Sequence, residues 1–93
     1  MSESFKKAWR GWIRSSDGYQ IRMLGRTGID YQDDRGQLRI DAEGMSSPWN
    51  EIVVYSGSIP DTPERAREEV LDRLSRAFEF AGWTLTVEDA WPS

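Results

Sequence analysis

The feature that most constrains this chain of 93 residues is that its sequence predicts a single long helix. Thr62-Pro63-Glu64 is typical of a helix start, because a threonine oxygen can accept from exposed backbone N–H groups and proline suits the first helical position. The predicted helix runs to about Ala81, just before Gly82, a residue that suits the position after a helix end. Its apolar stripe must cover a sheet built by the rest of the chain, and it consists of Ala66, Val70, Leu74, Ala77, Phe78 and Ala81.

Short segments of alternating apolar and polar residues, separated by turn residues, predict that sheet. Asp17-Gly18 and Asp33-Asp34-Arg35-Gly36 mark two of the turns. The predicted strands are residues 12–15, 19–24, 29–32, 37–41, 51–55 and 83–87, with a loop at 42–50. We therefore expect an α+β fold with two layers: a mostly antiparallel sheet of five to six strands and one long amphipathic helix packed on one face.

The length of the chain fits one domain, so we expect residues 1–93 to form a single unit. A short N-terminal helix over residues 2–9 is a further expectation, since Ser2 or Ser4 can cap it. Residues 88–93 are expected to form a frayed acidic tail.

The absence of histidine and cysteine excludes several kinds of chemistry. Ser-His-Asp and Cys-His catalysis require residues that this chain lacks, and so do the usual zinc sites. Paired carboxylates can perform acid–base chemistry or bind Mg²⁺, but no such pairing is evident in the sequence. We therefore expect no enzyme activity, no metal and no cofactor.

The net charge of −4 is unevenly distributed. Residues 1–26 hold six bases and two acids (+4), whereas residues 27–93 hold six bases and fourteen acids (−8). This acidic balance disfavours nucleic acid as a partner, because phosphate contacts need a net basic face. No apolar run approaches the ~18 residues that span a bilayer, and no signal peptide is evident, so we expect a cytoplasmic protein without a membrane partner.

Several segments, in their order and spacing between Tyr19 and Val87, resemble a family of small immunity proteins of bacterial polymorphic-toxin systems. They are Arg39-Ile40-Asp41-Ala42-Glu43, then Ile52-Val53-Val54-Tyr55 with Ser58-Ile59, and then the helix end Arg76-Ala77-Phe78-Glu79-Phe80-Ala81-Gly82 with the following strand. The resemblance implies a protein that binds and neutralises a co-encoded toxin. It assigns no toxin-contacting residues.

The best interface candidate is Trp49, in a proline-containing loop, together with an acidic rim of Asp41, Glu43 and Glu51. Tryptophan is enriched at interface hot spots, although Trp49 can equally fold back over the open end of the core. Asp33 and Asp34, with Asp30 nearby, form a second acidic cluster that can meet a basic toxin surface or remain a solvated turn.

Three functional hypotheses follow. The first is an immunity protein that neutralises a cognate toxin domain by stoichiometric occlusion. The second is a non-catalytic interaction module or a small chaperone of a secretion system. The third is a nucleic-acid binder that uses the N-terminal bases with Trp9 and Trp12 as stacking platforms.

Overall fold

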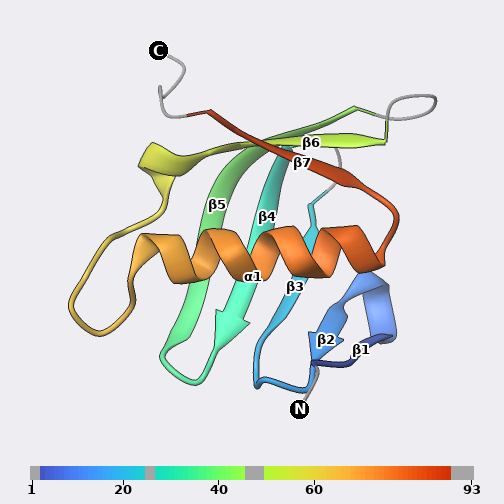
Figure 1. The fold of residues 1–93 in the computed structure, drawn as a ribbon, viewed down its shortest axis with the longest axis horizontal. Helices are drawn as coiled ribbons and strands as arrows, with labels where there is room; N and C mark the ends of the chain where they lie inside the picture. The colour runs from blue at the N-terminus through green and yellow to red at the C-terminus, as the bar shows by residue number, and fades with distance from the viewer. Residues whose placement is uncertain (1–2, 25–26, 46–49, 89–93) are drawn as a thin grey trace.

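A strongly curved sheet wraps around one helix in the computed structural model, which describes residues 3–24, 27–45 and 50–88 (Figure 1). One α-helix, α1, spans Arg67–Phe80, and two short 3₁₀ turns, η1 and η2, span Trp9–Gly11 and Ser56–Ser58. The seven strands are β1 (Phe5–Lys7), β2 (Ile13–Ser15), β3 (Gln20–Met23), β4 (Thr27–Asp33), β5 (Gly36–Met45), β6 (Glu51–Tyr55) and β7 (Thr84–Glu88).

The strands follow one another across the sheet in chain order, β1-β2-β3-β4-β5-β6-β7. Neighbours are antiparallel from β1 to β6, whereas β7 is parallel to β6 because α1 lies between them in the chain. The predicted sheet of five to six strands is therefore wrong: in the described residues the sheet is mixed and has seven strands, which together contain more residues than α1.

The prediction of one long helix is also wrong, because α1 has 14 residues and is about 21 Å long. Thr62 does not cap the helix. Its backbone exchanges two hydrogen bonds of 3.1 Å with Arg65, so Pro63 and Glu64 form the corner of a tight turn. The helix begins one turn later, where the Asp61 carboxylate accepts a hydrogen bond of 3.0 Å from the N–H of Arg67.

Two further segments pair as strands where the sequence predicts a helix and a loop. Phe5–Lys7, within the predicted N-terminal helix, forms β1 against β2. Ala42–Met45, within the predicted loop, continues β5 and pairs with β6 from Ala42↔Val54 to Met45↔Glu51. These backbone hydrogen bonds outweigh the weak local strand preference of a segment that contains Gly44.

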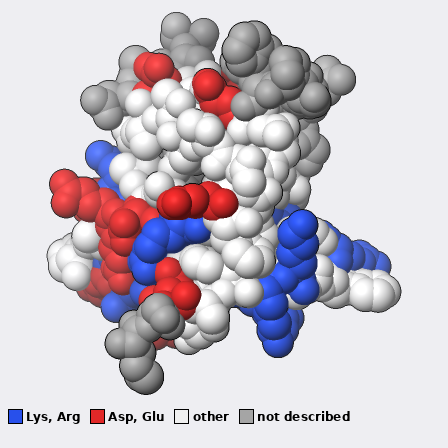
Figure 2. Space-filling model, turned by 45° about the vertical axis from the view of Figure 1, so that its right-hand side comes forward, with Lys and Arg blue, Asp and Glu red and all other residues white. Residues whose placement is uncertain are grey.

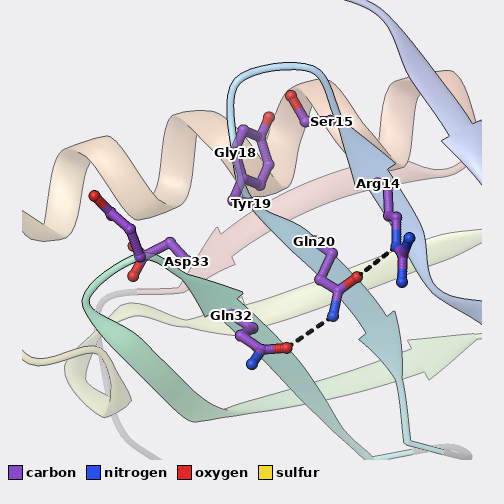
Figure 3. Close-up of a pocket in the computed structure, with 8 residues that line it drawn as sticks. Arg14, Ser15, Gly18, Tyr19, Gln20, Gln32 and Asp33 are labelled. Carbon is purple, nitrogen blue, oxygen red and sulfur yellow. Dashed lines mark hydrogen bonds between the residues drawn. The ribbon is translucent and has the colours of Figure 1, made fainter.

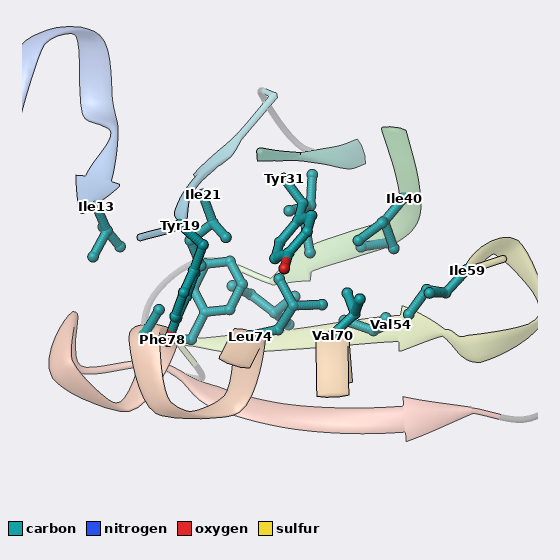
Figure 4. Close-up of a cluster of buried hydrophobic side chains, with 14 residues drawn as sticks. Ile13, Tyr19, Ile21, Tyr31, Ile40, Val54, Ile59, Val70, Leu74 and Phe78 are labelled. Atoms are coloured by element: carbon teal, nitrogen blue, oxygen red, sulfur yellow. The ribbon is translucent and has the colours of Figure 1, made fainter. Parts of the chain in front are cut away.

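The core lies between the concave face of the sheet and α1 (Figure 4). Sheet residues such as Ile21, Tyr31 and Ile52 meet Val70 and Leu74 of α1, and all five have an exposed fraction of 0%. Burial of an aliphatic side chain of this size contributes roughly 1.5–3 kcal/mol. Because strand side chains alternate, the residues between these buried positions lie on the opposite, convex face of the sheet, which α1 does not cover.

Truncation of the central helix residue tests this arrangement. We expect Leu74→Ala to lower the free energy of unfolding by about 2–5 kcal/mol, because it leaves a cavity against the sheet. The neighbouring Ser75→Ala, at an exposed position, is the control and should change the free energy by no more than about 0.5 kcal/mol. Denaturant titration followed by circular dichroism measures both, and equal losses would contradict the proposed core.

Candidate partner-binding site

Asp33 has a structural role in the fold. Its side chain is only 1% exposed and pairs with Arg65 and Arg73 at 2.6 and 3.5 Å. The Tyr31 hydroxyl donates a hydrogen bond of 2.7 Å to the same carboxylate, and so does the backbone N–H of Arg35 at 2.8 Å. The cluster joins the β4–β5 turn to α1 and to the turn before it, so its charge is used within the molecule.

The titration behaviour of this cluster follows from its contacts. Burial raises the pKa of Asp33, but hydrogen bonds from Tyr31 and Arg65, with the positive charge of Arg65, outweigh burial and hold that pKa below its ordinary 3.8. Burial, and then the hydrogen bond to Asp33, raise the pKa of Tyr31 to about 12. Asp33 therefore stays ionised and Tyr31 stays protonated across the physiological pH range.

The structure separates the acidic cluster that the sequence groups around Asp33. Asp30 lies on the convex face, with its side chain 3% exposed between Arg22 at 3.0 Å and Arg39 at 3.3 Å. Asp33 lies on the opposite, helix-facing side, and only Asp34 is exposed. Asp34 lines a hollow of about 370 Å³ together with Arg14, Gln20 and Gln32. Arg14 donates a hydrogen bond to Gln20, and Gln20 donates one to Gln32 (Figure 3).

The other predicted carboxylates do share a surface. Asp41 and Glu43 alternate on β5, and Glu51 lies on β6, paired with Met45 two residues beyond Glu43. Glu88 of β7 joins them, because it is the neighbour of Tyr55 in the parallel β6–β7 pair. We call Asp41, Glu43, Glu51 and Glu88 the acidic surface. Glu51 is half-buried, the other three are exposed, and none of the four forms an ion pair within the described residues.

Tyr55 lies at the centre of the acidic surface and lines a hollow of about 280 Å³ with Asp41, Glu43 and Arg39. Partial desolvation, and then the charge and hydrogen bond of Glu43, raise the pKa of Tyr55 above its ordinary 10.0. The site thus offers an aromatic ring that donates a hydrogen bond, surrounded by carboxylates. Such a site fits a cationic group of a partner better than an anionic one.

Reasoning from the sequence missed Tyr55 and Glu88 as members of this surface. The alternation in β6 places Tyr55 opposite the buried Val54, but the parallel pairing that brings Glu88 beside it could not be read from the chain. Trp49, the predicted anchor, lies outside the described residues and stays a prediction.

Several carboxylates elsewhere in the described residues form ion pairs within the chain, unlike the four of the acidic surface. Glu3 pairs with Arg76, Asp30 with Arg22 and Arg39, and Asp33 with Arg65 and Arg73. Asp72 and Glu69 pair along α1 with Arg76 and Arg73. The charges on the β5–β7 end of the convex face therefore remain available to a partner.

Neither a metal site nor a spanning helix is found in the part of the chain that the structure describes. Within residues 3–24, 27–45 and 50–88, no three acidic side chains gather as ligands for an ion. In the same residues, no helix is long and apolar enough to cross a membrane.

Comparisons with known proteins give one limited similarity. No family model and no solved structure matches the chain. Two curated proteins, from two strains of Methylorubrum extorquens, share 42% identity with it over 59 residues, and both are described as tRNA N6-adenosine threonylcarbamoyltransferase. The match covers 62% of this chain but only 16% of each enzyme, so the chain spans a small part of the length of these relatives.

The structural role of Asp33 gives a pH-dependent prediction. We expect Asp33→Ala to lower the free energy of unfolding by about 2–3 kcal/mol at pH 7, because it removes the buried carboxylate that pairs with Arg65 and Arg73 and accepts from the Tyr31 hydroxyl. The folded pKa is depressed, so this contribution is present above the unfolded pKa and is lost as the pH falls through the folded one.

Urea titrations of the wild type and the variant, at neutral pH and below pH ~4, measure this difference. The exposed Asp34→Ala is the matched control and should change stability by no more than about 0.5 kcal/mol. A difference between wild type and Asp33→Ala that stays constant down to the acid range would show that the ionised carboxylate is not what stabilises the cluster.

Proposed function

We propose that this chain is an immunity protein, which binds a cognate bacterial toxin domain in the cytoplasm and neutralises it by stoichiometric occlusion. The observation that carries the proposal is the acidic surface: four carboxylates and Tyr55 on a rigid sheet, with no ion pair among the described residues to neutralise them. Its chemistry complements a basic cleft, such as the substrate cleft of an enzyme that acts on nucleic acid.

The ordered resemblance supports the same proposal, because it falls on the strands that build this surface. Arg39 to Glu43 belongs to β5, and Ile52 to Tyr55 belongs to β6. The surface requires no chemistry of its own, because an occluding inhibitor needs shape and charge complementarity and preorganised side chains. Three paired strands supply that preorganisation.

A growth assay tests the proposal. Cells that express the toxin-like domain encoded beside this gene should grow when the chain is present and stop growing when it is absent. Equal killing in both cases, with the chain folded and abundant, would reject the immunity function for that partner. A chain that copurifies with a secretion component and whose deletion impairs secretion would instead support the chaperone hypothesis.

Charge reversal should then locate the contact. We expect Asp41→Lys and Glu43→Lys each to weaken toxin binding by about tenfold or more, because each places a cation where the partner presents one. Glu68→Lys, at an exposed position of α1 and with the same change in net charge, is the matched control. Isothermal titration calorimetry measures all three, and equal affinities would place the contact elsewhere on the molecule.

A further inference from the structure

A second charged surface, of opposite sign, lies at the other edge of the sheet. β1, η1 and β2 form a short arm, residues 5–15, that pairs with the rest of the sheet only through β3. Its four cations are Lys6, Lys7, Arg10 and Arg14, and none forms an ion pair within the described residues. Figure 2 shows Lys and Arg side chains gathered at the lower right, the end where the arm lies in Figure 1.

An exposed tryptophan lies at the end of this arm. Trp9 is 75% exposed, the largest exposed fraction among the large apolar side chains that the structure describes. The next residue, Arg10, has the left-handed backbone conformation (φ 60°, ψ 34°), which is uncommon for a residue other than glycine. Its guanidinium lies 5.8 Å from the Trp9 ring centroid. Gly11 also has a positive φ of 82°, so Arg10 and Gly11 form the tight turn that reverses the chain between β1 and β2 and places Trp9 at the tip.

The arm is held firmly to the body of the protein. The N–H of Ala8 donates a hydrogen bond of 2.7 Å to the carbonyl of Trp12 and closes the tip. At its base, the Glu3 carboxylate accepts from the Ser15 and Tyr19 hydroxyls and pairs with Arg76 of α1. The backbone that carries Trp9 is therefore held in place and needs little ordering on binding.

The cations surround the arm on several sides. Lys6 and Arg14 are opposite each other across β1 and β2 and share one face of the ribbon, whereas Lys7 lies on the other face, opposite Ile13. Lys6 and Arg14 also line a hollow of about 410 Å³ with Phe5 and three serines, Ser4, Ser15 and Ser16. The Ser15 hydroxyl already donates to Glu3, but Lys6 and Arg14 together with the hydroxyl groups of Ser4 and Ser16 suit a phosphate diester.

We propose that the arm docks on the surface of a bilayer containing anionic lipid, with Trp9 in the headgroup region and the four cations among the lipid phosphates. A projecting tip with cations on both faces and at its end fits a layer of headgroups that surrounds it, whereas a single nucleic-acid strand would contact one side. Tryptophan prefers the interface between headgroups and acyl chains.

The position of the acidic surface agrees with this orientation. The acidic surface lies on β5–β7, at the opposite edge of the sheet from the arm. Repulsion from anionic lipid would turn that surface away from the bilayer and leave it open to a partner. Docking on the bilayer surface differs from the expectation of no membrane partner, which considered only segments that span a bilayer.

Vesicle sedimentation with the full chain tests the docking. We expect the chain to sediment with vesicles of phosphatidylcholine and phosphatidylglycerol at low salt, and to remain in solution with phosphatidylcholine alone. The double variant Lys6→Gln, Lys7→Gln should lower the partition coefficient by about 25-fold, because the loss of each cation lowers it by about fivefold. Trp9→Ala should lower it by about fivefold or more, without loss of stability, since the ring is exposed.

Two control variants make the result specific to the arm. Gln37→Glu with Ser75→Glu has the same net charge as the double lysine variant but leaves the arm intact, and Val87→Ala removes an apolar side chain that is 42% exposed at the other edge. Both should bind vesicles as the wild type does. The proposal would be overturned if the control variants lost as much vesicle binding as the arm variants. It would also be overturned if the wild-type chain did not bind the mixed vesicles.

Binding to a fluorescein-labelled single-stranded oligonucleotide tests whether the arm recognises the phosphates of nucleic acid instead of those of lipid. Binding of the oligonucleotide, lost on Trp9→Ala, while the mixed vesicles remain unbound, would overturn the proposal in favour of nucleic acid. The inference goes beyond the immunity function, and the vesicle assay involves no toxin. A chain that binds vesicles but gives no rescue, or the reverse, shows which of the two proposals has failed.

Discussion

The fold depends on the fact that one helix of 14 residues is the main cover for a sheet of seven strands. The sheet can bury its apolar side chains only by curving around α1, and its concave face therefore contains Ile21, Tyr31 and Ile52 at 0% exposure (Figure 4). The convex face has no such cover and must be polar. Both surfaces that we assign to partners, the acidic surface and the arm, belong to the sheet outside this core.

Internal ion pairs determine which charges remain on those surfaces. Asp33 pairs with Arg73 and Glu3 pairs with Arg76, so the two carboxylates tie the β4–β5 turn and the segment before β1 to α1. Asp30 neutralises Arg22 and Arg39 in the middle of the convex face. Within the described residues, the sheet keeps unpaired cations at β1–β2 and unpaired carboxylates at β5–β7, so its two edges differ in the partners they attract.

Strand alternation predicted segments that overlap β2 to β7, since period-two patterns reflect burial directly. The helix start was mispredicted because Thr62-Pro63-Glu64 serves equally well as a tight turn, and only the contact of Arg65 with Asp33 decides between them. Asp41, Glu43 and Glu51 were identified from sequence as a rim, and the structure places them on one surface. Tyr55 and Glu88 required the parallel β6–β7 register, a tertiary contact that no local pattern contains.

Carboxylate footprinting of the chain, free and bound to its toxin domain, tests the central claim most directly. Carbodiimide labelling followed by mass spectrometry reports the accessibility of each Asp and Glu side chain. We predict that binding shields Asp41, Glu43, Glu51 and Glu88, while Glu64 and Glu68 before and within α1 label as in the free protein. Shielding of Glu64 and Glu68 with unchanged labelling on β5–β7 would contradict the account.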